Sequence, residues 1–274
     1  MSGKGVPECD VPTCGCNAVH PSAAKGRNKA CFIACTDSDD QDVEAFVKFE
    51  RRCENGSNAL IREALSAFFA IDLGLPTPQP LLVEVGPDFI DSLIDEELKG
   101  QLRAGSRFGY GTVALPNGYN IIAPAKPLRK DDLQVAAEIL AFDAAAMNPD
   151  RKAGNPNLMD GPGGLAVIDH DLCFVIDELA KALGIFPWRD GQMQNYCGPE
   201  KHIFWPALNG CTVDLSEFRS RVERMPGTRF DDYAACIPPE WRNRDDVTDS
   251  IVHYMKQLHG NVDTFVKEVL RALR

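Results

Sequence analysis

The most constraining stretch of this 274-residue chain is residues 148–171, which read NPDRKAGNPNLMDGPGGLAVIDHD. Asp150 is followed five residues later by Asn155, and the apolar run 164–168 ends in a second carboxylate, Asp169. An apolar run this short is typical of a buried strand, and a carboxylate at its end needs a cation or hydrogen bonds. Phosphoryl transfer requires a carboxylate that orients the attacking hydroxyl and oxygen ligands that hold Mg2+ on the phosphates. The segment therefore predicts a hairpin that carries a phosphoryl-transfer site.

The residue types of this hairpin suggest a role for each polar side chain. We predict that Asp150 is catalytic, that Lys152 reaches a phosphate as a point charge, and that Asn155 and Asp169 bind the metal. A structural role is the alternative for each, because Asp150 could cap a turn, and Asn155 and Asn157 could bond their own backbone. The spacing favours Asn155 over Asn157 as the metal ligand, and the choice between them stays open.

Size and charge narrow the classes of function. A chain of this length can bury roughly three quarters of its unfolded surface, so one large domain or two lobes can fold. Lys and Arg number 29 against 40 Asp and Glu, and this net charge of −11 opposes binding to nucleic acid. The first twenty residues contain no apolar run of signal-peptide length, and later apolar segments are broken by charges. We expect a cytoplasmic protein that binds neither nucleic acid nor a membrane.

The ten cysteines are expected to be reduced thiols, since a chain of this size does not need disulfides. Cys9, Cys14, Cys16 and His20 could together satisfy tetrahedral zinc, but their C-x4-C-x-C-x3-H spacing lacks the gap of common zinc knuckles. Residues 1–28 are rich in Gly, Pro, Ser and Cys without a hydrophobic period. We therefore predict a flexible, Cys-rich N-terminal tail, and metal binding by these four residues stays open.

Two elements after this tail suggest an ion pair. Residues 30–35 and 43–49 are predicted to form a β-hairpin, in which alternation places Phe46 and Lys48 on the same face. Residues 58–73 are predicted to form a helix with almost no charged face, so Glu63 needs a partner. A Lys48–Glu63 pair would orient the amine towards the α- and β-phosphates of a nucleotide.

The rest of the chain completes an α+β pattern of two lobes. We predict a strand at 78–85, a helix at 88–102, short strands within 105–122, a helix at 131–147 and mainly helices after residue 171. The expected domains are a small, mixed β, nucleotide-binding lobe with one key helix at 29–122, and a larger, mainly helical lobe with the catalytic loop at 123–274. A cleft is expected between them.

Taken together, these segments resemble the HipA-like kinase family, which has a protein-kinase-like fold. The resemblance covers nearly the whole chain and rests on VKF at 47–49, GSRF at 105–108, NPDRKAGNPNL at 148–158 and IDHD at 168–171. It implies a catalytic Asp150, a phosphate-contacting Lys152, a metal-binding Asn155 and Asp169, and an ion pair of Lys48 with Glu63. The chain departs from kinases at His170–Asp171, which replace Phe-Gly, and it has no A-P-E segment. Residues 22–26, the best match to a phosphate-covering loop, contain one glycine.

The expected function is an ATP- and Mg2+-dependent phosphotransferase, a serine/threonine kinase that acts on itself, on another protein or on a small-molecule acceptor. The adenine is expected against the face of Phe46, near residues 111–115. One alternative is a kinase-like module that binds nucleotide with little turnover. The other is a metal-dependent phosphoesterase built from four carboxylates, Asp143, Asp150, Asp169 and Asp171.

Overall fold

The protein is described here by a computed structural model, which covers residues 11–20, 29–123, 127–175, 183–244 and 246–274, with His20 by its backbone only. The chain forms two compact units. Unit 1 comprises Met1–Leu65, Gln79–Ala114 and Thr228–Asp249, and unit 2 comprises Ser66–Pro78, Leu115–Gly227 and Ser250–Arg274. The units do not share the boundaries of the two expected lobes, because residues 66–78 and 115–122 belong to unit 2 and Thr228–Asp249 to unit 1. A lobe boundary at residue 122 stays a prediction.

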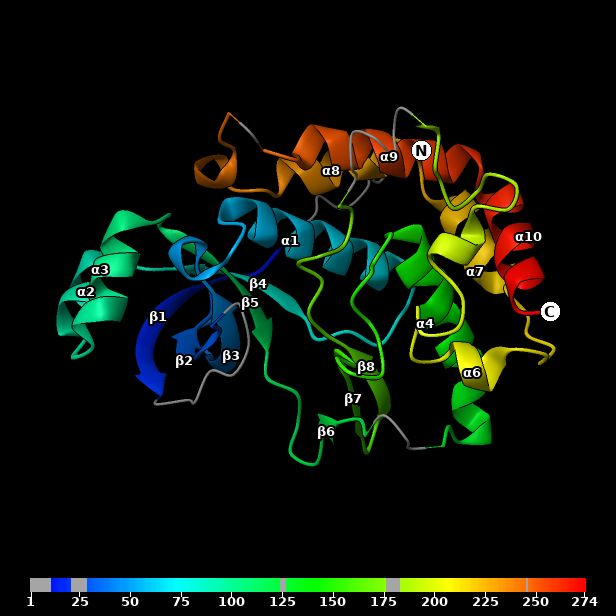
Figure 1. Ribbon diagram of the computed structural model, residues 1–274. Coiled ribbons are helices and arrows are strands. Elements are labelled where there is room, and N and C mark those ends of the chain that lie inside the picture. Colours follow the sequence, from blue (N-terminus) through cyan, green and yellow to red (C-terminus); the bar gives the residue numbers. More distant parts are fainter. Residues whose placement is uncertain (1–10, 21–28, 124–126, 176–182, 245) are drawn as a thin grey trace, which may run out of the picture. The chain divides into compact units, whose positions relative to one another are not determined.

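Unit 1 is built on a closed five-stranded barrel in the order β1-β2-β3-β5-β4 (Figure 1). Its neighbouring strands are antiparallel except β1 and β4, which are parallel. The strands are β1 (Thr13–His20), β2 (Cys31–Thr36), β3 (Asp42–Lys48), β4 (Pro80–Glu84) and β5 (Phe108–Val113). The predicted hairpin at 30–49 is confirmed, and Asp37 closes its turn by accepting hydrogen bonds from the amides of Asp39 and Gln41.

The prediction of a flexible tail is wrong for Thr13–His20, which form β1. The strand pairs with β2 on one edge and, through Thr13–Gly15, with β4 on the other, and this second pairing closes the barrel. The sequence of Thr13–His20 does not alternate between apolar and polar residues, so its pattern does not predict a strand. The Gly, Cys and Ala residues of this segment have little preference for strands, so its pairing with β2 and β4 in the fold makes it a strand.

The barrel interior follows the alternation of β3. Ala45 and Val47 are fully buried, whereas Phe46 and Lys48 lie on the opposite face of the strand. Gly109 on β5 is required by close packing, because a Cβ there would lie 2.7 Å from a ring carbon of Phe49. The barrel core therefore depends on one strand that leaves room for the side chains of its neighbour.

Two helices cover the barrel where one was predicted. The expected helix at 88–102 is divided into α2 (Pro87–Ser92) and α3 (Glu96–Ala104). Asp95 starts the second helix as its N-cap, since its carboxylate accepts hydrogen bonds from the amides of Glu97 and Leu98. Phe89 of α2 and Leu98 of α3 belong to the same buried cluster as the barrel interior.

The predicted helix at 58–73 is confirmed as α1 (Ser57–Asp72), which contributes residues to both units. Its buried residues occupy nearly every side, as the scarcity of charges in its sequence indicates. The helix stops at Gly74, whose φ of 66° lies in the left-handed region that favours glycine. Unit 1 also contains η1 (Glu50–Arg52), α8 (Arg229–Ala235) and η4 (Pro239–Trp241).

Unit 2 surrounds a buried helix, α4 (Leu133–Ala145), which follows the single turn η2 (Lys130–Asp132). Helices α6 and α10 pack on α4, and α7 packs on α10 (Figure 1). The short strands expected within 105–122 belong to two different sheets. β5 is part of the barrel, whereas β6 (Asn120–Ile121) pairs with β7. Within the described residues, the other elements with residues in unit 2 are β7 (Leu158–Gly161), β8 (Gly164–Val167), η3 (Met193–Asn195), α6 (Trp205–Leu208), α7 (Ser216–Arg224), α9 (Thr248–Gly260) and α10 (Val262–Ala272).

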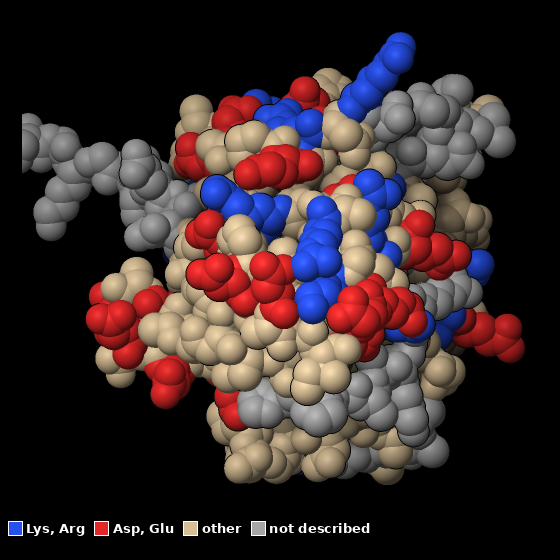
Figure 2. All heavy atoms as spheres, turned by 90° about the vertical axis from the view of Figure 1, so that its left-hand side faces the viewer, with Lys and Arg blue, Asp and Glu red and all other residues tan. Residues whose placement is uncertain are grey.

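Charges of both signs are interspersed on the face of the molecule shown in Figure 2. Acidic and basic side chains lie next to one another there, and many of the ion pairs of the protein are exposed, such as Arg103–Asp91 and Arg107–Glu84. Exposed pairs of this kind contribute little to stability. Among the helices of the described residues, none combines the length and the apolar character that a membrane span requires.

Candidate functional site

The loop that carries Asp150 begins where α4 ends. Met147 has a φ of 49°, and the amide of Asn148 donates a hydrogen bond of 2.7 Å to the carbonyl of Asp143, so the chain leaves the helix axis there. The side-chain oxygen of Asn148 then accepts a bond of 3.0 Å from the amide of Asp150. This turn presents Asp150 at the start of the loop that leads into β7.

The carboxylate of Asp150 is held by two asparagines. Its Oδ2 atom accepts a hydrogen bond of 2.7 Å from Nδ2 of Asn155 and one of 3.0 Å from Nδ2 of Asn157. In the described part of the chain, no hydrogen bond or ion pair reaches its Oδ1 atom. One oxygen is therefore oriented by the loop, and the other is available to a hydroxyl group. Because each asparagine donates through its amide nitrogen, each keeps an amide oxygen that could bind a metal.

A buried ion pair fixes this loop. Arg151, with 0% of its surface exposed, donates from Nε to Oδ2 of Asp143 over 2.5 Å. Its Nη1 atom also donates to the carbonyl of Asn157 and, at 3.4 Å, to the carbonyl of Ile168. One guanidinium thus joins three separate segments, α4, the end of the Asp150 loop and the end of β8.

His202 completes the surroundings of Asp143. Its Nδ1 atom accepts a hydrogen bond of 3.1 Å from the amide of Phe204, so Nε2 carries the proton that faces Oδ2 of Asp143 at 2.9 Å. The other carboxylate oxygen accepts a bond of 2.7 Å from Asn148. Burial alone would raise the pKa of Asp143, but the charge of Arg151 and the hydrogen bond from His202 hold it well below its usual range.

The second carboxylate follows β8. Asp169 has a φ of 60°, and one of its oxygens lies within 4.8 Å of a carboxylate oxygen of Asp171. His170 between them is buried, with its ring edge-on to Phe142 at 5.6 Å. The amide of Ile168 donates to the carbonyl of Asn157 over 3.1 Å, which attaches this segment to the Asp150 loop. Carboxylate and amide oxygens are the donors that Mg2+ prefers, and this backbone hydrogen bond joins the two segments that carry them.

Unit 1 contains the predicted ion pair. Nζ of Lys48 on β3 contacts Oε1 of Glu63 on α1, and the Glu63 side chain is 2% exposed. Phe46 lies on the same face of β3 and is 49% exposed, with its ring 4.9 Å from that of Phe32. An apolar ring and an oriented amine on one sheet face could receive the base and the phosphates of a nucleotide.

One predicted site residue is exposed, and others lie outside the described residues. Lys152 is exposed, and only its backbone is fixed, by a bridge to Asn155. Cys9 and residues 22–26 lie outside the described residues, so neither the four-ligand metal site nor the phosphate-covering loop is described. Cys14 and Cys16 are free thiols on β1.

Sequence reasoning missed the structural roles of Arg151 and His202. One signal was available for the first, because Asp143 is an acidic residue in the otherwise apolar second half of α4 and a buried carboxylate needs a cation. Arg151, directly after Asp150, lies close to Asp143 in the sequence and was therefore a candidate for this cation. Nothing near His202 in the sequence points to Asp143, which is 59 residues away.

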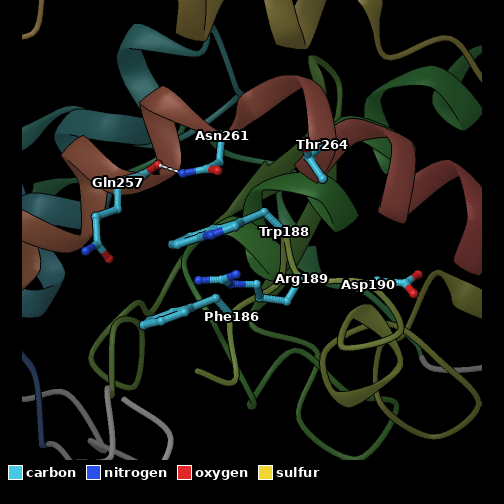
Figure 3. Close-up of a pocket in the computed structure, with 7 residues that line it drawn as sticks. All are labelled: Phe186, Trp188, Arg189, Asp190, Gln257, Asn261 and Thr264. Carbon is cyan, nitrogen blue, oxygen red and sulfur yellow. Dashed lines mark hydrogen bonds between the residues drawn. The ribbon is translucent and has the colours of Figure 1, made fainter. Parts of the chain in front are cut away.

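A separate pocket of about 430 Å³ lies in unit 2, on the loop after residue 183 (Figure 3). The rings of Phe186 and Trp188 are stacked in parallel with centroids 4.8 Å apart. The side chain of Arg189 extends in the same direction as these two rings (Figure 3). Trp188 packs on Tyr254 at 5.3 Å, and the Tyr254 hydroxyl donates to the carbonyl of Ala145 at the end of α4. The aromatic wall of the pocket and the Asp150 loop are thus both attached to this helix end. The other lining residues are Asp190, Gln257, Asn261 and Thr264.

Comparison with known proteins identifies first the fold and then the family. A crystal structure of a Helicobacter pylori proinflammatory kinase, CtkA, matches with a TM-score of 0.51 and 12% identity, over 93% of this chain and 96% of that chain. The chain therefore has a kinase-like fold. A family model described as HipA-like kinase matches residues 22–270, and the chain belongs to this family.

The structure of a pseudokinase in its apo form matches with a TM-score of 0.30 and 11% identity, over 91% of this chain and 97% of that chain. None of the proteins with curated descriptions matches.

Proposed function

We propose that the protein is an ATP- and Mg2+-dependent phosphotransferase that phosphorylates a serine or threonine of itself or of another protein. The observation that carries the proposal is the orientation of the Asp150 carboxylate. Two asparagines orient one of its carboxylate oxygens, the other oxygen has no partner among the described residues, and the loop is anchored by the buried Arg151. A carboxylate oriented in this way is what an attacking hydroxyl requires.

The remaining roles follow from side-chain chemistry. Asp150 accepts the proton of the acceptor hydroxyl as that oxygen bonds to the γ-phosphorus, and the bond from the γ-phosphorus to the bridging oxygen of ADP breaks. Lys152 is free to contact a phosphate. Lys48, oriented by Glu63, aligns the α- and β-phosphates, and Phe46 packs against the adenine.

Mg2+ would be held by Asn155 and Asp169, with Asp171 near enough to add a carboxylate. When bound, the ion neutralises charge on the phosphates. Asn157 stays the alternative to Asn155, since both donate to the same oxygen of Asp150 and both keep an amide oxygen. We also propose a cytoplasmic protein whose partners are ATP and a protein or small-molecule acceptor.

The test is incubation with γ-labelled ATP and Mg2+, followed by detection of labelled protein. Asp150→Asn and Asp169→Asn should each lower transfer by roughly 100- to 10,000-fold, and Asp150→Asn should still bind nucleotide. Asp263→Asn, a change at an exposed carboxylate of α10, is the matched control and should leave transfer unchanged. Transfer that survives in Asp150→Asn would refute the role of this residue.

One alternative is a nucleotide-binding module with little turnover. Its support is the single glycine of residues 22–26 and the replacement of Phe-Gly by His170–Asp171. This module would bind labelled ATP in the same assay and label neither itself nor a generic protein substrate.

The phosphoesterase alternative is disfavoured by Asp143. Both of its oxygens already accept hydrogen bonds, from Asn148, Arg151 and His202, so it has little capacity to bind a metal. A phosphoesterase would also hydrolyse p-nitrophenyl phosphate without ATP, and Lys48→Ala would not affect it.

A further inference from the structure

The barrel of unit 1 carries a group of cysteines that the proposed phosphoryl transfer does not use. Cys14 on β1 and Cys31 and Cys35 on β2 are buried, and Cys16 on β1 is partly exposed. Cys31, Ile33 and Cys35 alternate along β2 and face the barrel interior. The proposed nucleotide-binding side chains lie on the opposite face of the sheet, so these thiols need another explanation.

Two of these cysteines face each other across neighbouring strands. In the antiparallel pairing of β1 with β2, Cys16 is the register partner of Cys35. Directly opposed residues in such a pair have Cα atoms about 4.5–5.5 Å apart, which lies inside the range of about 4.4–6.8 Å that a disulfide spans. Cys14 instead faces Val83 on β4, and Cys31 faces Val47 on β3. Of these four cysteines, the strand register therefore places one pair, Cys16 and Cys35, directly opposite each other.

The two sulfur atoms already interact. A hydrogen bond from Cys16 lowers the pKa of Cys35, although burial opposes this effect. The same hydrogen bond, together with burial, raises the pKa of Cys16. Each thiol thus has the other as its hydrogen-bond partner, in agreement with the register of β1 and β2.

We propose that Cys16 and Cys35 form a thiol–disulfide exchange site, which reacts with a small-molecule disulfide and closes a bridge between β1 and β2. Cys16 is the less buried residue of the pair. As its thiolate, it attacks one sulfur of the disulfide, the S–S bond breaks, and the first small thiolate leaves and takes up the proton. Cys35 then loses its proton and attacks the Cys16 sulfur, and the second small thiolate leaves. The two cysteines lose two electrons and two protons, and the small disulfide is reduced to two thiols.

The test treats the full-length protein with glutathione disulfide, blocks the remaining thiols with N-ethylmaleimide and digests it with trypsin without reduction. Cleavage after Lys4, Lys25, Lys29 and Lys48 places Cys9, Cys14 and Cys16 in peptide 5–25, and Cys31 and Cys35 in peptide 30–48. We expect the loss of two thiols per chain and a linked pair of these peptides. Excess reduced glutathione should restore both thiols.

Single variants assign the bridge. Cys16→Ser and Cys35→Ser should abolish the linked peptides, whereas Cys9→Ser, Cys14→Ser and Cys31→Ser should retain them. Serine is close to cysteine in size, and circular dichroism of each variant verifies its fold.

Three results would overturn the proposal. The link could survive in Cys16→Ser, or wild-type protein could carry only glutathione adducts. Stoichiometric Zn2+ could also protect Cys14, Cys16, Cys31 and Cys35 together from N-ethylmaleimide, which would identify a metal site instead. None of these results depends on phosphoryl transfer, so the two proposals fail separately.

Discussion

Removing the carboxylate of Asp143 should destabilise the protein by about 3–5 kcal/mol, because it leaves the guanidinium of Arg151 buried without its counter-ion. The structure supports a value in this range, since Arg151 is completely buried and the Nε–Oδ2 distance is 2.5 Å. A globular domain is stable by only about 5–15 kcal/mol, so the loss is a large share of the total. Asp143→Ala is therefore expected to unfold at much lower urea concentrations than wild type.

A double-mutant cycle isolates the ion pair from the other effects of the substitution. Arg151→Met removes the charge and keeps an apolar chain, so the double variant has no uncompensated guanidinium. Replacement of both partners of a buried pair often costs little. We expect the double variant to be more stable than the sum of the single variants predicts, by roughly 2–3 kcal/mol.

The assay is a urea titration followed by circular dichroism, with hydrogen exchange of peptides that span residues 143–158. Exchange of the Ile203 amide, which donates to the carbonyl of Arg151, reports locally on the same loop. The control is Asp263→Ala, which breaks an exposed pair with Arg219 and should cost no more than about 1 kcal/mol. Strict additivity of the two single changes would refute the coupling between Asp143 and Arg151.

Three further predictions concern the titration of Asp143, the packing at Gly109 and the Cys16–Cys35 bridge. The folded-state pKa of Asp143 is lowered, so its contribution to stability is complete above the unfolded value of about 3.9 and is lost as the pH falls below it. Asp143→Asn should therefore flatten the pH dependence of the unfolding free energy below about pH 4, and an unchanged slope would contradict this. Gly109→Ala should cost about 1–3 kcal/mol in urea unfolding, since its Cβ would lie 2.7 Å from the nearest ring carbon, whereas Gly86→Ala, with open space around it, should cost little. The Cys16–Cys35 bridge would close a loop of about 20 residues and should add about 3 kcal/mol to the unfolding free energy, measured with and without reductant.

Parts of the fold were predictable because neighbours in the sequence determine them. The hairpin of β2 and β3 follows from two alternating runs around an acidic turn, and α1 follows from its apolar period and Gly74. The Lys48–Glu63 contact was also predictable, because an acidic residue on a helix with almost no charged face needs a cation. The break between α2 and α3 was missed, since the capping role of Asp95 requires a known helix start.

The sequence by itself determined the hairpin of residues 158–167 and the polar side chains that flank it, because two short runs around a Gly- and Pro-rich turn pair with each other locally. The tertiary structure alone decided how those side chains are held. The closure of the barrel by β1, the contact of His202 with Asp143 and the register that opposes Cys16 to Cys35 each join residues from separate elements. The apolar periodicity of a sequence indicates which face of a helix or strand is buried. It does not indicate which other element covers that face.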